Sequence, residues 1–510
     1  MLGYRMSLFR WVTLVSGLME CLCYSGIYLG WTSLVFILKT EGYFSDLCLN
    51  TTGANSTVFT DCSAQDSQLS LVITIGMCMT VVLSFPMGFI FDNLGTMATR
   101  ILSISIHTTG SLLLALSSRE LPLLIFPAVS CHAVAGLALL TANIQVANLF
   151  GSNRSLITAL FCGLFDSSPV TVLIIKVLYE NGISLRSSFL FMAACSVIYL
   201  LQTFLLLPKT HIPYPLPEDY TYGMSCYSQS NSMEQEGAGL QKANGNVQKK
   251  RYIYTITSQS RDSQPSQSSA VNEPSLWSCV LSWAFLFHLL WISIGRFNSS
   301  FLPVTLNPMI NHLADGNLTL VSRYTNAFAV AQLCGVFCAP CNGLIMDRNK
   351  GKQRVPGETE KEADLRSCVL SLFITSLVCL LFCICASIPV LPLQYLTFIL
   401  HVIGSAFLFS GNSSFISIAF PSRFYGMLTG LGYCLSACWV LFHYPLMIVV
   451  TDVLQGNPVY VFIGMTLLSL LTFIHPLYIY LHCRRLSAHR PTPPKYCLHA
   501  ITKPEVTANF

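Results

Sequence analysis

Charged side chains are scarce in this chain of 510 residues, where Asp, Glu, Lys and Arg make up only 10%. Soluble domains carry about 25% of these residues, whereas apolar residues reach 53% here and the mean hydropathy is +0.58. This balance excludes an ordinary soluble enzyme, a disordered scaffold and a nucleic-acid-binding protein. It indicates a polytopic membrane protein, in which the net charge of +5 reflects orientation more than a ligand.

The sequence also lacks the clusters that catalysis would need. His and Cys do not occur together at zinc-ligand spacing, and no grouped nucleophile is present. We therefore expect no enzymatic activity, no catalytic residues, no metal and no cofactor. No small-residue cleavage site follows the first apolar run, so we expect this run to be kept as a membrane anchor.

The sequence contains many long apolar runs. Crossing the membrane takes about 20 mostly apolar residues, and we identify six such runs before a polar stretch and six after it. The predicted spans are 11–37, 69–91, 99–117, 121–145, 156–178, 187–208, 277–303, 323–346, 367–388, 390–418, 424–450 and 457–481. They predict an all-α fold with two six-helix bundles, at 1–208 and 277–481.

The polar stretch 209–276 is rich in Ser, Gln, Asn and Glu, which predicts a mostly disordered linker. If the N-terminus is on the inner side of the membrane, this linker, the segment 347–366 and the tail 482–510 are on the inner side as well. Most of the 28 Lys and Arg residues then lie on that inner side. The positive-inside rule therefore predicts that both termini are cytosolic. We expect a multi-pass plasma-membrane protein that contacts lipid, does not bind nucleic acid and is a monomer.

The outer loop 39–68 carries two glycosylation sequons, at Asn50 and Asn55. Sequons in an outer loop are accessible for modification, so we expect a glycan at one or both sites. Asn317 is a further candidate close to the membrane. The sequon at Asn412 lies inside a predicted span, and we expect it to stay unmodified.

Two cysteines, Cys48 and Cys62, lie in the same outer loop. Disulfides form in oxidising compartments, so we predict that these two residues are bonded. Most of the other cysteines fall within spans, where cysteine behaves as a small apolar residue.

A short motif occurs once in each half of the chain. Gly88 precedes Asp92 by four residues after the second span, and Gly343 precedes Asp347 by four residues after the eighth. Two copies in register resemble the Gly-x-Leu-Ala-Asp-Arg-x-Gly signature of the major facilitator superfamily, which implies the fold of that superfamily and a role in gating. The glycine allows two helices to approach closely, and the aspartate can cap a helix N-terminus or pair with an Arg.

The first copy departs from the signature, because Asn93 stands where the superfamily favours Arg. Arg100 is the nearest basic substitute. The second copy keeps the basic residue as Arg348. We expect these residues to serve folding and gating without touching substrate.

Few charges occur within the predicted spans: Glu20, Asp166, Lys176 and Arg296. Ionisable groups inside a membrane are costly and usually face a cavity or a partner. Glu20 and Asp166 both reach about the middle of their spans, as counted at about 1.5 Å per residue. Ten residues separate Asp166 from Lys176, so we do not expect these two to pair.

An ion-driven transporter would need carboxylates that carry protons or sodium. No acidic chain adjoins the two midplane carboxylates in the sequence, which favours a facilitator. His288 and His401 reach a similar depth, and we interpret both as hydrogen-bonded packing residues. A receptor or scaffold that transports nothing would not need polar groups at mid-depth in both halves.

Several segments resemble solute carrier family 43, and the resemblance covers nearly the whole chain outside the linker and tail. These segments are 29–31, 165–168, 174–179, 211–217, 324–328 and 391–398. The resemblance implies sodium-independent, bidirectional transport of either large neutral amino acids or purine nucleobases. The His-Ile-Pro-Tyr-Pro-Leu-Pro run at 211–217 and the Phe-Asp-Ser-Ser segment at 165–168 resemble the nucleobase-transporting branch, which implies adenine, guanine and hypoxanthine as substrates.

A purine would need a flat apolar surface and several hydrogen-bonding groups. Aromatic stacking stabilises a bound base by about 1–3 kcal/mol, and amides or carboxylates suit its polar edges. Our candidates for substrate binding are Glu20, Asp166, Asn326, Gln332, Trp31, Phe297, Tyr433 and Trp439.

Glu20 is the favoured candidate, since the first span of this superfamily lines the central cavity. Its carboxylate could bind a purine or hold the two halves together through a polar partner. For an amino acid, Glu20 and Arg296 could instead bind the ammonium and the carboxylate, so residue chemistry alone leaves both substrates open.

Overall fold

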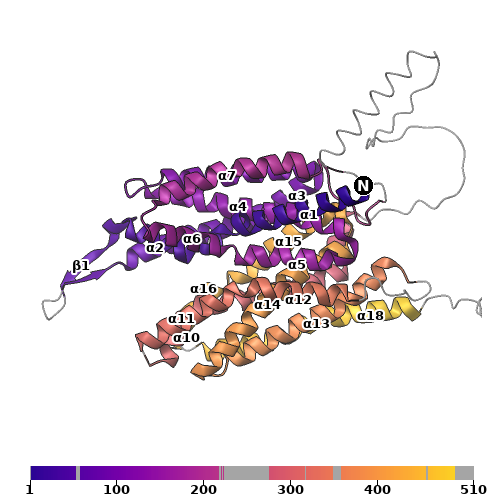
Figure 1. Cartoon of the computed structure of the whole chain (residues 1–510). Coiled ribbons are helices and arrows are strands. Elements are labelled where there is room, and N and C mark those ends of the chain that lie inside the picture. Colours follow the sequence, from indigo (N-terminus) through magenta and orange to yellow (C-terminus); the bar gives the residue numbers. More distant parts are fainter. Residues whose placement is uncertain are drawn as a thin grey trace, which may run out of the picture.

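The computed structural model of the protein describes residues 2–52, 58–217, 220, 222, 275–315, 317–348, 358–454 and 458–488. These residues are almost entirely helical and form two bundles, which Figure 1 shows as an indigo-to-magenta half and an orange-to-yellow half. Asn55, most of the predicted linker and most of the tail lie outside the described residues.

The first bundle contains α1 (Leu2–Glu20), α2 (Trp31–Thr40), α3 (Ser63–Leu116), α4 (Ile125–Ile144), α5 (Arg154–Ser167), α6 (Pro169–Glu180) and α7 (Leu185–Leu206). The second contains α9 (Leu276–Val280), α10 (Trp283–Leu313), α11 (Leu318–Leu333), α12 (Gly335–Asp347), α13 (Glu360–Ala386), α14 (Gln394–Ala419), α15 (Tyr425–Val440), α16 (His443–Ile448), α17 (Val459–Ser469) and α18 (Ile474–Ala488). The bundles meet where α3 packs against α15 and α5 packs against α12.

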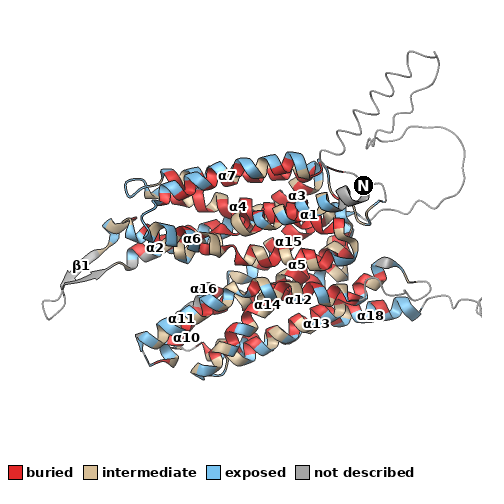
Figure 2. Ribbon diagram, viewed as in Figure 1, coloured by how far each residue is buried: buried red, intermediate tan, exposed pale blue. Residues whose placement is uncertain are grey.

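The outer surface of the bundles is apolar, in contrast to a soluble protein. On α7, for example, Phe191, Val197 and Ile198 are 68%, 58% and 61% exposed. Figure 2 shows exposed residues along the outside of α7 and buried ones on its inner side. Apolar side chains on the outside suit contact with lipid tails, because each helix satisfies its backbone hydrogen bonds internally.

The twelve predicted spans fall largely on helical residues. Within the described part of the chain, six helical stretches are long and apolar enough to cross a membrane, or eight when each of two bent helix pairs counts as one. Two of the six, Ser67–Leu116 and Pro122–Glu180, are 50 and 59 residues long, so each contains two of the predicted spans. In α3 the two arms are separated at Gly95, whose φ of 83° is readily adopted only by glycine.

One element of the fold is not helical. In the outer loop, β1 (Leu49–Thr52) pairs antiparallel with β2 (Val58–Asp61), with Asn50 opposite Thr60. The predicted all-α fold class is confirmed by the two bundles, and this hairpin is a small addition to it in the outer loop, at the left end of the molecule in Figure 1. A loop held at its base can pair its own backbone groups outside the membrane.

Two spans of the first bundle are interrupted at the same level. The first span bends by 44° between its two helical parts at Gly26, where a methyl group would lie only 2.5 Å from the backbone oxygen of Phe165. Pro169 opens α6 directly after the end of α5. Interrupted helices near mid-depth are typical of binding sites in transporters, and Tyr28 and Asp166 lie on these two interruptions.

The beginning of the predicted linker packs against the first bundle. The backbone N–H of Ile212 donates to Gln145 at 3.0 Å, and its carbonyl accepts from Asn148 at 2.8 Å. Ile212 is only 1% exposed, and the His211 ring lies 4.8 Å from that of Phe91. The described part of 209–222 is therefore an ordered extension of the bundle.

Candidate functional site

At the end of the molecule opposite the hairpin, each motif aspartate caps a helix of the other bundle. The carboxylate of Asp92 accepts hydrogen bonds from the backbone N–H groups of Gly426 and Met427, at 2.9 and 2.6 Å. These two residues form the first turn of α15, whose N–H groups have no partner within the helix. A negative charge there is also stabilised by the helix dipole.

The second copy of the motif makes the reciprocal contact. Asp347 accepts from the backbone N–H groups of Ser155 and Leu156, at 3.3 and 2.8 Å, in the first turn of α5. Of the two roles expected for the motif aspartates, the structure shows helix capping. The two caps join the bundles in a symmetric way.

The motif glycines lie where the two backbones come closest. A methyl group at Gly88 would lie 2.1 Å from the backbone oxygen of Gly426, and one at Gly343 would lie 2.4 Å from the Cα of Leu156. Real side-chain atoms do not approach this closely, so only glycine permits the caps to form. The expected close approach of two helices thus occurs between the bundles.

The two basic residues assigned to the motif, Arg348 and Arg100, lie in different surroundings. Arg348 donates to the backbone oxygen of Ser367 at 3.1 Å and so joins α12 to α13. The expectation that Arg100 replaces the missing motif arginine near Asp92 is wrong. Arg100 follows Gly95 by more than one helical turn, which carries its side chain into the interior of the first bundle at 0% exposure.

Glu20 is the partner of Arg100. The two side chains are both 0% exposed and form an ion pair at 2.8 Å. Asn143 donates to Glu20 at 2.9 Å, and Thr203 accepts from Arg100 at 3.0 Å. Of the roles expected for Glu20, the structure therefore shows a polar partner, although within one bundle and not between the two halves.

A second charged group lies between the bundles and includes Asp166. The guanidinium of Arg296 on α10 lies 5.1 Å from the ring centroid of Tyr433 and 5.7 Å from that of Phe409. From the first bundle, Asp166 and Tyr28 both interact electrostatically with Arg296. We call these five residues, Tyr28, Asp166, Arg296, Phe409 and Tyr433, the central site.

The chemistry of the central site suits a flat polar ligand. It combines a carboxylate, a guanidinium and three aromatic rings from both halves of the chain, and Asp166 and Arg296 are only half-buried. Of these five residues, Tyr433 also lines a cleft between α3, α4 and α15 that extends to Gly88 and Gly426.

The structure does not place the remaining sequence candidates around Arg296. Phe297 is 6% exposed and packs in the core of the second bundle, and Trp31 packs at the edge of a core cluster in the first. Asn326 and Gln332 are exposed on α11, and Trp439 is 37% exposed on α15. Helical periodicity turns successive positions of a span to different faces, so depth alone could not separate these residues.

Sequence reasoning missed Tyr28 and Phe409 as members of the central site. The sequence signal for Tyr28 was its position between two glycines, Gly26 and Gly30. In the structure, methyl groups at these two glycines would collide with the fifth span. Phe409 carried no signal that distinguishes it from other aromatic residues of α14. Lys176 lies 3.8 Å from Glu180, in agreement with the expectation that it does not pair with Asp166.

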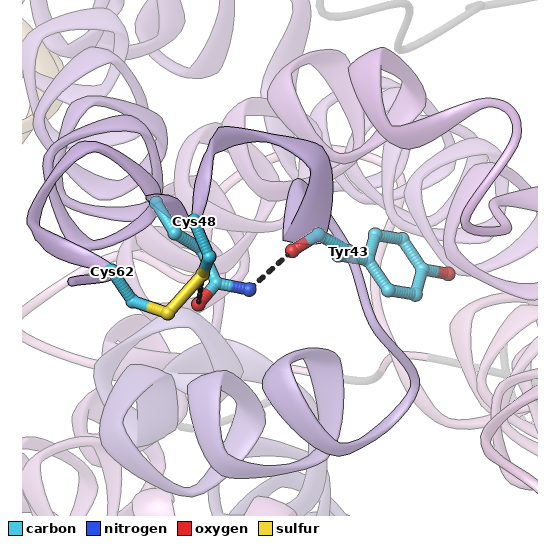
Figure 3. The surroundings of a disulfide bond; sticks show 4 residues. Tyr43, Cys48 and Cys62 are labelled. Atoms are coloured by element: carbon cyan, nitrogen blue, oxygen red, sulfur yellow. Dashed lines mark hydrogen bonds between the residues drawn. A yellow bond between two sulfur atoms is a disulfide. The ribbon is translucent and has the colours of Figure 1, made fainter. Parts of the chain in front are cut away.

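The outer loop contains the predicted disulfide. Cys48 and Cys62 are bonded across a sequence separation of 14 residues, and beside them Gln65 donates to the backbone oxygen of Tyr43 at 2.7 Å (Figure 3). The bond closes the base of the hairpin that carries Asn50. Asn317 caps α11 by accepting from Thr319 and Leu320, and its side chain is exposed.

Comparison with known proteins agrees with this architecture. Residues 21–442 match the Major Facilitator Superfamily. The proton:xylose symporter XylE of the same superfamily has a similar structure, with a TM-score of 0.53 over 94% of this chain and 96% of that one. Its sequence is only 10% identical, so this likeness concerns the fold alone.

Two relatives are similar over almost their whole length. The chain is 42% identical to the equilibrative nucleobase transporter 1 of Bos taurus, over 94% of this chain and 98% of that protein. It is 28% identical to the large neutral amino acids transporter small subunit 3 of Homo sapiens, over 98% of both chains. The chain therefore belongs to the major facilitator superfamily, a family of multi-pass membrane transporters, and its relatives agree with the predicted place in solute carrier family 43.

Proposed function

We propose that this protein is a facilitative transporter of purine nucleobases such as adenine, guanine and hypoxanthine. The observation that carries the proposal is the 42% identity, over nearly the full length of both chains, to a protein named as an equilibrative nucleobase transporter. The central site supports it, because it offers the groups that a purine requires.

Each part of a purine has a counterpart in the central site. Asp166 accepts hydrogen bonds from ring N–H or exocyclic amino groups, and Arg296 donates to ring nitrogens or a carbonyl oxygen, as these side chains do with bases in nucleic-acid complexes. The rings of Tyr28, Phe409 and Tyr433 provide stacking surfaces, each worth about 1–3 kcal/mol for a stacked base. Glu20 serves this site indirectly, by fixing the bundle that carries Tyr28.

Transport proceeds by alternating access in this proposal. The two aspartate caps close the end opposite the hairpin, which we assign to the cytosol together with both termini. The hairpin with Asn50 then faces outward from the plasma membrane. Movement is passive and independent of sodium, and the protein works as a monomer.

A second substrate class is favoured by one specific observation. Asp166 and Arg296 come from opposite bundles and interact electrostatically, and these two opposite charges could bind the ammonium and the carboxylate of an amino acid. The lower identity of 28% to a large neutral amino acids transporter makes this the weaker proposal. Purines do not need two full charges, so the two substrates respond differently to loss of either one.

Uptake of radiolabelled adenine and leucine distinguishes the two proposals. Cells that express the protein should take up adenine several-fold faster than control cells, and unlabelled guanine and hypoxanthine should compete. Leucine should neither enter faster nor compete. Leucine uptake without adenine uptake would assign the protein to the amino acid transporters.

A second measurement tests the passive mechanism. Replacing sodium should leave adenine uptake unchanged, and external purine should accelerate the efflux of internal purine. In cells that cannot metabolise the base, the internal concentration should not exceed the external one. Steady accumulation above that level would show coupling to an ion gradient.

A further inference from the structure

The ordered start of the linker, residues 209–217, is fixed to the first bundle through its backbone. The carbonyl of Thr210 accepts from the hydroxyl group of Thr96 at 2.8 Å. Two residues later, the N–H of Ile212 donates to the side chain of Gln145 at 3.0 Å, and Ile212 is 1% exposed. The side chains of residues 211–214 therefore have a fixed position relative to this bundle.

Arg154, the first residue of α5, crosses from the first bundle to the second. Its guanidinium donates to the backbone oxygen of Ser417 at 3.2 Å, and its side chain is buried. Ser417 lies in the last turn of α14, and the residue four positions later is Pro421, which has no N–H to offer this oxygen. Arg154 thus satisfies a helix-end carbonyl, where the helix dipole also favours a cation. It is a third clamp between the bundles, directly next to the cap that Asp347 forms on α5.

Tyr214 of the linker holds this arginine in place. The guanidinium carbon of Arg154 lies 4.1 Å from the ring centroid of Tyr214, which is within the range of a cation–π interaction. An arginine side chain loses rotamer freedom when it is ordered. Stacking on a ring with an anchored backbone removes part of this cost before the clamp closes. Tyr214 is therefore a positioning residue that acts through Arg154.

His211 supports the other aspartate cap from the same segment. Its ring lies 4.8 Å from that of Phe91, which directly precedes Asp92 and is 2% exposed. Phe91 in turn packs against the second bundle, because a methyl group added at Gly426 would lie 2.9 Å from its ring. The linker segment thus contacts two residues of the first bundle, one beside each cap, and both reach the second bundle.

We propose that residues 209–217 form a brace that holds Arg154 and Phe91 ready for contact with the second bundle, and thereby stabilises the conformation closed toward the cytosol. Interactions shift a conformational equilibrium only by the difference that they make between the two states. The brace makes such a difference, because the contact from Arg154 to Ser417 requires the bundles to be together. The inference rests on the alternating access of the proposed function and not on the identity of the substrate.

Labelling of an introduced cysteine from the cytosolic side measures this equilibrium. Thr141→Cys on α4 places a thiol in the cleft between α3, α4 and α15, and this variant is the parent for all comparisons. Inside-out membrane vesicles are treated with a maleimide, and mass spectrometry of the labelled peptide distinguishes the introduced thiol from native ones. Cys383 on α13, which is 0% exposed, is the internal reference for general loosening of the fold.

Variants of Tyr214 test the brace itself. Tyr214→Ala should raise the labelling rate about three- to tenfold, as expected for loss of a cation–π contact to a buried guanidinium. Tyr214→Phe keeps the ring and should label at the parental rate. Labelling of Cys383 should stay unchanged in both. The matched control is Tyr478→Ala on α18, whose ring packs against Phe287 and His482 within the second bundle, and it should also label at the parental rate.

Two further variants tie the effect to the residues that the brace contacts. Arg154→Lys keeps the charge but loses the planar group that stacks, so labelling should rise to a similar extent. Combining it with Tyr214→Ala should add nothing, since both changes remove the same contact. Should Tyr214→Ala fail to accumulate in the membrane, His211→Ala removes the other arm of the brace and should raise labelling by a smaller factor.

The outcomes separate the brace from the proposed substrate. Parental labelling in Tyr214→Ala would overturn the inference, and so would equal acceleration in Tyr214→Phe, in Tyr478→Ala or at Cys383. Independent effects of Tyr214→Ala and Arg154→Lys would show that the segment does not act through the clamp, which also overturns it. Labelling needs no substrate, so absence of adenine uptake would overturn the proposed function while the test of the brace still stands.

Discussion

Two pairs of opposite charges lie within the membrane-spanning part of the protein, and they differ in what surrounds them. Glu20 and Arg100 belong to the same bundle, are 0% exposed and form an ion pair at 2.8 Å. Asp166 and Arg296 belong to opposite bundles, are half-buried and influence each other without direct contact. The first pair is complete by itself, whereas the second leaves hydrogen-bonding capacity for a ligand.

The comparison shows how one kind of chemistry serves two purposes in one chain. A fully buried ion pair with additional hydrogen bonds is stable only as a unit, because removal of one partner leaves an uncompensated charge. Contacts within a bundle do not need to change during transport. Contacts between bundles must form and break as the protein alternates, which applies to the aspartate caps and to the central site.

Breaking the pair within the bundle should have the largest effect. Glu20→Ala leaves Arg100 buried without a counter-charge and should destabilise the fold by about 3–5 kcal/mol. We expect almost complete loss of surface protein, measured by surface biotinylation and by thermal unfolding of the purified protein. The double variant Glu20→Gln, Arg100→Met removes both charges and should recover part of the surface expression.

The exposed pair of Lys176 and Glu180 provides a matched control, since its side chains are 28% and 48% exposed. Lys176→Ala should change stability by less than about 1 kcal/mol. Normal surface expression of Glu20→Ala with unchanged transport would contradict the structural role of the buried pair.

Breaking the pair between the bundles should spare folding and impair transport. Asp166→Asn and Arg296→Gln each remove a charge from a half-buried position, so surface expression should stay within twofold of wild type. Loss of one base-reading contact is worth about 1–3 kcal/mol, which corresponds to an increase of about 5- to 150-fold in the KM for adenine. Uptake kinetics at equal surface density measure this, and wild-type KM values in both variants would remove these residues from the site.

A third variant concerns the closed end between the bundles. Gly88→Ala places a methyl group where only 2.1 Å separates it from the backbone of Gly426, and overpacking of this kind costs about 1–3 kcal/mol. The cost falls only on the conformation with that end closed. We expect faster labelling of a cysteine introduced at the cytosolic end, together with a several-fold change in the ratio of influx to efflux.

Gly432 on α15 is the control for this variant, because no atom lies within 4 Å of a methyl group added there. Gly432→Ala should leave labelling and flux unchanged. Equal behaviour of the two alanine variants would show that the glycine contact does not hold the bundles closed.

The smallest effect on transport is expected outside both bundles. Asn50→Gln with Asn55→Gln should abolish the shift in gel mobility that glycosidase treatment produces, while adenine uptake per surface molecule stays unchanged. A shift that persists would direct attention to Asn317. A raised KM in the double variant would show that the outer loop takes part in substrate binding.

The two copies of the Gly-x-x-x-Asp motif show how far the sequence leads. Their spacing predicted a repeated gating element. A glycine followed by an aspartate four positions later can serve close packing and capping at any junction between two helices. The spacing could not predict which helices Asp92 and Asp347 cap. The residues that donate to them, Gly426 and Ser155, lie 334 and 192 residues away along the chain.

Arg100 shows the opposite case, in which a local rule failed. Its nearness to Asn93 along the chain suggested a substitute for the motif arginine. The turn at Gly95 redirects the following helix, and the bundle offers Glu20 and Asn143 as partners. A buried guanidinium is stable only where its N–H groups have hydrogen-bond partners. For Arg100 on α3, these partners lie on α1, α4 and α7.

The sequence by itself determined the membrane-spanning class, the duplicated architecture, the outer disulfide and the family, because hydropathy, spacing and motif identity are properties of short segments. Only the tertiary structure decided which intramembrane charges face one another. Glu20 and Asp166 have the same chemistry and similar depth, yet one is enclosed with Arg100 and the other faces Arg296 across the bundle interface. The rotation of each helix about its own axis makes this difference, and that rotation is set by packing against neighbouring helices.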